Sequence, residues 1–454
     1  MNNLNFLVDV LKESPVFKTL EKNVKPGRTV CASGLSTINK SNIIYALCRL
    51  KGVTAFCLAS DEKEAQTLCN DLSCMGLRAY VYPVRDFNFL DFQSRSHEYE
   101  HARLKVLLKL LNHECDVAIA CVDAAAQLTV PRNVLEQSVI EFEEGRELSL
   151  EKATKALTLL GYERFDAVEG SGQFSLRGGI LDFFMPDSDY PVRCEFWGDE
   201  ITDLSYFDIE TQRRFKKTDK ITLSPSTEIV IEDRAALADK IEHKAKLLRS
   251  KNSAKAKEKL FSEAELIRSG AMIANADKFI NQIYDKPESL FDYLDRNTLV
   301  FASEFTAIQE RGKSMDFISN ETLMQGFEDG TLCRGFDRFA LTFNECTEFL
   351  QSHGTIVLEN FVHGSMPIKL SEIISFSTKQ LSAWGGSYKQ LKEDVDGLFT
   401  PESKGVIFAG TERAAKNLCD TFNADGINAV YSEGADKISK GELLVMQGCI
   451  ECGL

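Results

Sequence analysis

The sequence of 454 residues lacks long hydrophobic runs, a secretory leader and repeated segments. No apolar stretch approaches the ~20 residues of a membrane-spanning helix, which argues against a membrane protein. The first residues, MNNLNF, have no basic stretch followed by an apolar core, so we expect no secretory signal. We expect a globular cytoplasmic protein of about three or four domains, since a domain usually has ~100–200 residues.

Paired cysteines are also scarce. The 13 cysteines are spread singly along the chain, and only Cys449 and Cys452 have C-x-x-C spacing. Because no second pair of Cys or His lies near them, we expect no metal site there. We expect no cofactor elsewhere in the chain either. Cysteines inside apolar segments, such as Cys57 and Cys121, are expected to behave as small buried hydrophobes in a reducing cytoplasm.

Positively charged residues are fewer than negatively charged ones. Lys plus Arg total 53 against 68 Asp plus Glu, which gives a net charge of −15. DNA is bound chiefly through Lys and Arg contacts with its phosphates, so an acidic chain is a poor candidate for tight unassisted DNA binding. We expect a monomer that does not bind DNA tightly by itself.

What the sequence does contain is an alternation of strand and helix over its first ~130 residues. Short apolar strands are predicted at 28–32, 53–58, 79–82 and 116–122, with helices between them. Asp61 is predicted to cap the helix after the second strand, with Glu64 three residues on. Alternating strands and helices indicate βαβ units and a parallel sheet, which a buried strand at 298–302 is predicted to join.

Closely spaced strands interrupt this pattern after a helix at 150–160; they lie at 173–176, 180–184, 192–197 and 201–207. Turn residues separate them, which indicates a small α+β unit with antiparallel pairing, inserted into the larger α/β domain. A βα pattern closes the chain, whose apolar last residues suggest a fragment of something longer. The predicted division is 1–135 and 223–378 for the split α/β domain, 136–222 for the inserted unit and 379–454 for a small C-terminal α/β domain.

A degenerate phosphate-binding loop is predicted at residues 34–41 (GLSTINKS). The motif G-x-x-x-x-G-K-[ST] wraps backbone N–H groups around phosphates, with Lys on their outer oxygens and a hydroxyl on Mg²⁺. Gly34, Lys40 and Ser41 are in register, but Asn39 replaces the second glycine. Asn tolerates positive φ, so the loop shape is not excluded, although the added side chains would crowd the phosphates. An ordinary strand-to-helix turn is the alternative interpretation.

The acidic strand of such a site is degenerate as well. The strand at 299–302 should be followed by Asp-Glu, in which Asp helps to hold Mg²⁺ and Glu aligns water, but Ser303 and Glu304 follow it. A serine hydroxyl does not supply the anionic charge that this position contributes to a hard cation. We expect no catalytic residues and no ATP hydrolysis, but a vestigial nucleotide site made of Gly34, Asn39, Lys40, Ser41, Ser303 and Glu304.

The most specific motif lies in the inserted unit. Residues 161–166 (GYERFD), 172–184 (GQFSLRGGILDFF), 191–201 (PVRCEFWGDEI) and 207–214 (FDIETQRR) closely resemble domain 2 of UvrB and of the bacterial transcription-repair coupling factors. The flanking α/β halves resemble the split first domain of the same proteins, whereas the segment after about residue 380 matches weakly. The resemblance implies a RecA-like, P-loop NTPase-like α/β domain with a degenerate nucleotide site, split by a UvrB domain 2-like unit.

Two relatives are distinguished by what is missing. UvrB keeps an intact phosphate loop and a long aromatic-rich hairpin that grips DNA, whereas residues 83–91 (PVRDFNFLD) here lead within a few residues into a helix near His101. The chain is therefore more similar to the N-terminal, UvrB-like part of the coupling factors. In that family RNA polymerase and DNA are contacted through a C-terminal part, with a DNA translocase, which this sequence does not contain.

In this family domain 2 binds UvrA. Matching the motif residue by residue places the docking positions at Arg164, Arg177, Arg193 and Glu195. Alternation within 192–197 sends Arg193, Glu195 and Trp197 to one face, and Arg and Trp are favoured residues at protein interfaces. The resemblance implies an adaptor that presents UvrA, and hence nucleotide excision repair, to a stalled RNA polymerase.

Three alternatives stay open. The arginines could pair only with neighbours such as Asp182, Glu195 or Asp199. The chain could be an ATP-driven DNA repair enzyme of the UvrB or helicase type, which would require ATP turnover that disappears with Lys40→Ala. The same face could also dock only within its own chain until transcription stalls. Phe174 and Phe184 are expected in the core, since strand aromatics usually pack inward.

Overall fold

The computed structural model describes residues 4–85, 97–248, 253–270, 276–361, 366–378, 384–433 and 438–448. The predicted absence of a DNA-gripping hairpin concerns residues 86–96, and the C-x-x-C pair is Cys449 and Cys452, so both predictions lie outside the described residues. No helix in the described ranges is long and apolar enough to cross a membrane.

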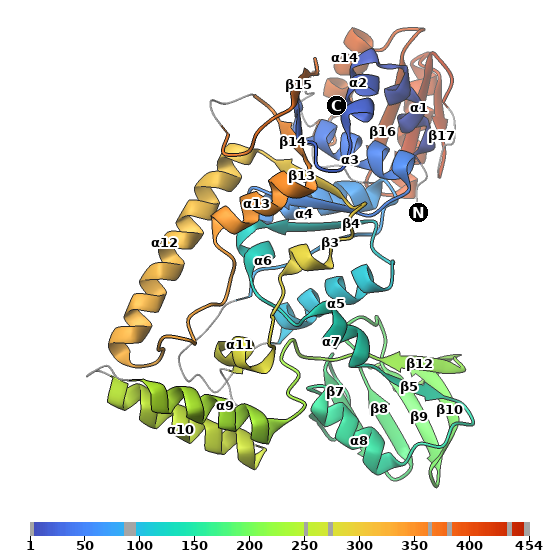
Figure 1. Cartoon of the computed structure of the whole chain (residues 1–454). Coiled ribbons are helices and arrows are strands. Elements are labelled where there is room, and N and C mark those ends of the chain that lie inside the picture. The colour runs from blue at the N-terminus through green and yellow to red at the C-terminus, as the bar shows by residue number, and fades with distance from the viewer. Residues whose placement is uncertain are drawn as a thin grey trace.

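A seven-stranded parallel sheet forms the main body, as the βαβ pattern predicts (Figure 1). In spatial order its strands are β15 (Glu372–Ser375), β1 (Val30–Ser33), β14 (Thr355–Glu359), β13 (Leu299–Ser303), β2 (Ala55–Ala59), β4 (Val117–Cys121) and β3 (Ala79–Val81), and each neighbouring pair is parallel. Because β13 follows the inserted unit in sequence but pairs with β2, the two halves of the split domain close into one sheet.

Helices bury a hydrophobic core on each face of this sheet. One face is covered by α1 (Asn5–Glu13), α2 (Pro15–Asn23), α3 (Thr37–Lys51) and α4 (Glu62–Cys74). The other is covered by α5 (Glu98–Leu111), α6 (Val122–Ala126), α13 (Phe343–His353) and the start of α12 (Phe305–Asp329). The Asp61 side chain accepts the N–H of Glu64 at 2.8 Å, so the predicted helix cap is confirmed.

The inserted unit contains a six-stranded sheet in the order β11-β10-β9-β8-β7-β6. Its strands are β6 (Glu163–Arg164), β7 (Gln173–Arg177), β8 (Ile180–Phe183), β9 (Val192–Trp197), β10 (Glu200–Phe207) and β11 (Arg214–Lys217). All neighbours are antiparallel except β6 and β7. A second pair, β5 (Ile140–Glu143) with β12 (Lys220–Leu223), joins the two ends of the unit, and α8 (Leu150–Leu159) packs on the sheet.

The antiparallel prediction is confirmed, but four strands of this unit were not predicted. β6 has two residues, and all of β11 is exposed, so neither shows the apolar alternation that identifies a strand; β5 and β12 are the others. The expectation for one aromatic was wrong. Phe174 is buried, whereas Phe184 is only half-buried, because alternation along β8 turns Leu181 and Phe183 into the core.

Two helical regions complete the fold (Figure 1). α9 (Arg234–Leu247) and α10 (Ser253–Ser269) pack together with η1 (Ala276–Phe279) and α11 (Ile280–Ile283), and the 25-residue α12 runs from the parallel sheet toward them. α12 was not predicted because its middle exposes Phe317, Ile318 and Met324 instead of presenting one buried stripe.

The C-terminal unit is a small α/β unit, as predicted, and its three-stranded sheet is parallel. It consists of β16 (Lys404–Ala409), β17 (Ala429–Tyr431) and β18 (Glu442–Gln447), in the order β16-β18-β17, with α14 (Tyr388–Leu398) and α15 (Glu412–Ala424). Leu444 and Met446 join the hydrophobic core under α1, α3 and α4, so this unit packs against the main body.

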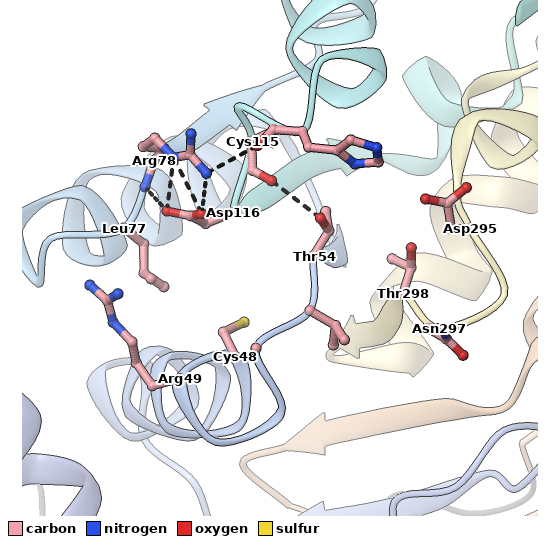
Figure 2. Close-up of a pocket in the computed structure, with 13 residues that line it drawn as sticks. Cys48, Arg49, Thr54, Leu77, Arg78, Cys115, Asp116, Asp295, Asn297 and Thr298 are labelled. Atoms are coloured by element: carbon pink, nitrogen blue, oxygen red, sulfur yellow. Dashed lines mark hydrogen bonds and ion pairs between the residues drawn. The ribbon is translucent and has the colours of Figure 1, made fainter.

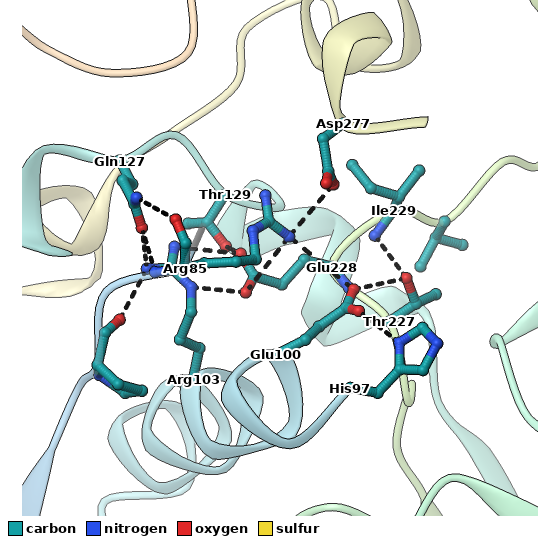
Figure 3. A network of polar contacts seen from close by, with 12 residues as sticks. Arg85, His97, Glu100, Arg103, Gln127, Thr129, Thr227, Glu228, Ile229 and Asp277 are labelled. Atoms are coloured by element: carbon teal, nitrogen blue, oxygen red, sulfur yellow. Dashed lines mark hydrogen bonds and ion pairs between the residues drawn. The ribbon is translucent and has the colours of Figure 1, made fainter. Parts of the chain in front are cut away.

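A buried network of charges ties the inserted unit to the main body (Figure 3). Arg103 on α5 donates from Nε to Oε1 of Glu228 at 2.7 Å, and both side chains are fully buried. Arg85 lies between Glu228, at 3.7 Å, and Asp277 of η1, at 3.3 Å. Glu100 accepts the N–H of Glu228 at 2.8 Å. These contacts hold the segment that leaves the inserted unit against α5 and η1, and so fix where the chain returns from the unit to the main body.

Candidate functional site

The segment predicted as a phosphate loop is folded into a helix. α3 begins at Thr37 with Ser36 as its N-cap, so Asn39 lies in the first helical turn and not in a loop with positive φ. The N–H of Lys40 donates to the carbonyl of Ser36 at 3.1 Å, as in any helix. The expectation that Asn39 could preserve the loop shape was therefore wrong: the helix has extended over the residues that would form the cradle.

The remaining loop amides are also engaged. The N–H groups of Gly34 and Leu35 donate to the carbonyls of Asn360 and Glu359, each at 3.1 Å. Gly34 has φ +77°, and a Cβ there would lie 2.1 Å from the carbonyl oxygen of Phe376. The chain around β14 and β15 therefore occupies the space and hydrogen bonds that a phosphate would need.

Lys40 is neutralised by carboxylates of its own chain. Its side chain is only 4% exposed, and Nζ lies 2.6 Å from Oε1 of Glu304 and 3.4 Å from Oε1 of Glu64. It also donates to Oγ of Ser303 at 3.0 Å, and Ser303 donates in turn to Glu64 at 2.5 Å. Predicted residues Lys40, Ser303 and Glu304 are thus brought together, and we call them, with Glu64, the Lys40 clasp.

The other predicted residues of the nucleotide site lie apart from the clasp. Ser41 is fully buried and donates to Oδ2 of Asp71 at 3.1 Å, while Nδ2 of Asn39 donates to Oγ of Ser36 at 2.7 Å. Glu64 was identified from the sequence only as part of a helix cap. Its contacts with Lys40 and Ser303 depend on β13 running beside β2, and no local sequence pattern indicates that pairing.

One carboxyl group beside the clasp was not found from the sequence. Glu359 ends β14, is fully buried, and accepts the N–H of Phe305 at 2.8 Å through Oε1. Burial raises the pKa of Glu359 to about 7, and the neighbouring carboxylate of Glu304 adds to the effect. Glu304 itself has φ +56°, an uncommon conformation for a residue with a side chain.

A cavity of about 470 Å³ lies elsewhere (Figure 2). It is lined by Thr54, Asp116 and Thr298, which precede β2, β4 and β13, so it opens at the amino ends of the strands. One of its two arginines, Arg78, is held by Asp116 through a 2.7 Å contact. Ligands of open parallel sheets bind at the carboxyl ends of the strands, where the Lys40 clasp lies, so this cavity lies at the opposite end from the predicted nucleotide site.

The outer face of the six-stranded sheet carries three of the four predicted docking residues, Arg177, Arg193 and Glu195. Along β9 the side chains of Val192, Cys194 and Phe196 are buried, whereas Trp197 is 82% exposed and Arg193 and Glu195 are partly exposed. The alternation predicted for this strand is therefore confirmed.

Arg193 and Arg177 share one buried carboxylate. Arg193 donates from Nε to Oδ1 of Asp182 at 2.7 Å and from Nη2 to Oδ2 at 2.8 Å, and Arg177 reaches Oδ2 through Nη2 at 2.8 Å. Asp182 is 1% exposed. The Arg193 side chain is 12% exposed and the Arg177 side chain 50%, so Arg177 has much the larger solvent-accessible part.

The remaining docking positions are more accessible than Arg193. Glu195 pairs with Arg214 of β11, which also lies 3.0 Å from Asp203 of β10. Arg164 is exposed on β6. Pairing with neighbours therefore accounts for Arg177, Arg193 and Glu195 in part, with Asp182 and Arg214 as the partners.

Fold and surface together define a UvrB-like interaction module. A protein family described as "UvrB interaction domain" matches residues 140–229, which include all four predicted docking positions. Relatives with similar sequences are named transcription-repair-coupling factors: the one from Bacillus subtilis is 25% identical over 98% of this chain and 38% of its own length. The one from Staphylococcus aureus strain MRSA252 is 21% identical over 99% of this chain and 39% of its own length.

The chain is homologous to the N-terminal part of the transcription-repair-coupling factors over nearly its whole length. It spans about two fifths of the length of these relatives. The match lies in the part of the relatives that lacks the translocase motor.

Proposed function

We propose that this chain binds UvrA through its six-stranded sheet, at Arg177, Arg193 and Glu195 on the outer face and at Arg164 on the edge strand β6. The observation that carries this proposal is the exposed, charged surface of β7–β9 inside the region that matches the UvrB interaction domain. A surface of arginines with one highly exposed tryptophan suits recognition of another protein.

The proposed consequence is an adaptor that brings UvrA, and with it nucleotide excision repair, to a stalled RNA polymerase. RNA polymerase and DNA would be contacted through the C-terminal part of the full-length relatives, which this chain does not match. Within the 454 residues the net charge of −15 argues against a second, DNA-binding function. We keep a cytoplasmic monomer as the expected state.

The α/β domain is proposed to be a RecA-like relic without ATPase activity. Supporting this, β1, which precedes Lys40, and β13, which ends at Ser303, are separated by β14 alone, so their carboxyl ends lie close together. Lys40 is already neutralised by Glu64 and Glu304, and the loop amides are bonded to carbonyls. We propose the division 1–135, 136–222, 223–378 and 379–454, supported by the β5–β12 pair that joins the ends of the inserted unit.

Calorimetric titration of purified UvrA with the wild-type chain and with Arg177→Glu tests the docking proposal. Reversing this charge should weaken binding at least tenfold, about 1.4 kcal/mol, while circular dichroism stays unchanged. Lys313→Glu, on the exposed part of α12, is a matched charge reversal that should leave the affinity unchanged. Equal affinities for wild type and Arg177→Glu would rule out this docking face.

The competing proposal, an ATP-driven DNA repair enzyme, has its own test. Steady ATP turnover by the purified chain that is lost in Lys40→Ala would establish it and would contradict the adaptor without catalysis. We expect no turnover in either protein, with or without DNA.

A further inference from the structure

Three side chains on the outer face of β7–β9 differ in how much of them a partner could reach. Arg193 is nearly enclosed, Arg177 is half exposed and Trp197 is 82% exposed. Trp197 has the largest exposed fraction among the large hydrophobic side chains of the described residues. Because their exposed fractions differ so much, these three residues are expected to have different functions in docking.

Arg193 has few donors left for a partner. Besides its two bonds with Asp182, its Nη1 donates to the carbonyl of Gln212 at 3.1 Å and its Nη2 to Oε1 of Gln212 at 3.0 Å. The guanidinium also stacks over the ring of Phe207, 4.3 Å from its centroid. Four of its donor contacts are thus made within the chain, and they hold the carboxylate of Asp182 in a fixed position.

Asp182 in turn orients Arg177. Its Oδ2 receives Nη2 of both arginines at 2.8 Å, so the position of Arg177 depends on a carboxylate that Arg193 holds. The exposed half of the Arg177 guanidinium remains accessible for a bidentate contact with a carboxylate on a partner.

Trp197 is held on a short, well-defined hairpin. It pairs with Glu200 across β9 and β10, and Gly198 adopts φ +64° in the turn between them. An aromatic ring on such a turn loses little conformational entropy when it is buried, which is why rigid aromatic side chains serve as anchors in interfaces. Glu195, two residues earlier on the same face, is already paired with Arg214.

We propose that Trp197 is the aromatic anchor of the docking face, that Arg177 is its charged contact, and that Arg193 is a positioning residue that acts through Asp182. The complementary partner surface is an apolar recess with a carboxylate beside it, because the indole is uncovered and Arg177 is the accessible cation. This assignment rests on the proposed docking to UvrA.

Calorimetric titrations of UvrA with single variants test the anchor. Trp197→Ala should weaken binding about thirtyfold or more, the range of an interface hot spot, and Trp197→Phe should keep part of the affinity. Phe317→Ala removes an aromatic side chain that is 62% exposed on α12, away from the inserted unit, and should change nothing. Because Trp197 lies outside the hydrophobic core, neither of its variants should alter the unfolding midpoint.

A double-mutant cycle tests the positioning function. If Arg193 acts through Arg177, then Arg193→Ala weakens UvrA binding in the wild type but has little further effect in Arg177→Ala. Additive losses would mean that Arg193 contacts UvrA directly and would overturn its assignment. Asp182→Asn, which keeps the side-chain shape, should reproduce the effect of Arg193→Ala and serves as the second variant if Arg193→Ala unfolds.

The outcomes separate the two proposals. A wild-type chain that does not bind UvrA defeats the proposed docking itself. A wild-type chain that binds while Trp197→Ala binds equally well defeats only the anchor assignment.

Discussion

The buried carboxyl of Glu359 provides a test of the Lys40 clasp that requires no partner. Its pKa is raised from the ordinary 4.5 to about 7, mainly by burial and further by Glu304. Because the folded state holds this proton more tightly than the unfolded state does, the resulting stability is fully present below about pH 4.5. It is lost as the pH rises through about 7.

The magnitude follows from the same shift. A change from 4.5 to about 7 corresponds to roughly 3 kcal/mol of unfolding free energy between acidic and mildly basic solution. Glu359→Gln removes the titration but keeps an oxygen that accepts the N–H of Phe305, which now lies 2.8 Å from Oε1. We expect the variant to match the wild type near pH 5 and to be more stable by about 3 kcal/mol at pH 8.

Urea unfolding followed by circular dichroism at pH 5, 6, 7 and 8 measures this difference. Glu348→Gln, an exposed residue on α13, is the matched control and should keep a constant offset from the wild type. A constant offset for Glu359→Gln as well would mean that this carboxyl does not hold its proton, and the account of Glu359 as a buried neighbour of Glu304 beside the clasp would be wrong.

Three further predictions concern stability. Lys40→Met should lower the unfolding free energy measured in urea by about 3 kcal/mol, because Glu64 and Glu304 lose their cation. Adding Glu304→Gln should restore part of the lost stability. An unchanged unfolding midpoint in Lys40→Met would contradict the clasp. Glu228→Gln should lower the unfolding free energy by a similar ~3 kcal/mol, because Arg103 and Arg85 lose a buried counter-charge. The control Glu232→Gln changes an exposed residue of the same segment and should have little effect on the unfolding free energy. Gly172→Ala should lower the thermal midpoint and speed proteolysis between the inserted unit and α5. The φ of Gly172 is +79°, and a Cβ there would lie 2.6 Å from the ring of His101. An unchanged thermal midpoint would show that the His101 ring can move aside without cost.

Local patterns were sufficient to predict the elements with strong periodicity. The apolar strands at β1, β2, β4 and β13, the cap at Asp61 and the alternation along β9 all follow from neighbouring residues alone, and the structure agrees. β11 and α12 were missed because their exposed side chains carry no periodic apolar signal.

In the candidate sites, too, local patterns predicted some residues and missed others. Lys40, Ser303 and Glu304 could be selected from a degenerate motif, but Glu64 and Glu359 join them only through strand order, which brings Glu64 to Ser303, 239 positions further along the chain. On the docking face, the sequence identified the arginines and offered Asp182 as one possible partner. That two arginines share it follows only from the register between β8 and its neighbouring strands. Motifs thus indicate which residues take part, and long-range packing decides how each is used.

Hydrogen–deuterium exchange of this chain with and without saturating UvrA is the most direct test of the central claim that β7–β9 bind UvrA and the Lys40 clasp takes no part. Protection is expected over residues 173–200 and not over residues 34–41 or 299–304. Protection confined to residues 34–41 and 299–304, or an unchanged exchange pattern over β7–β9 in a complex that demonstrably forms, would contradict it.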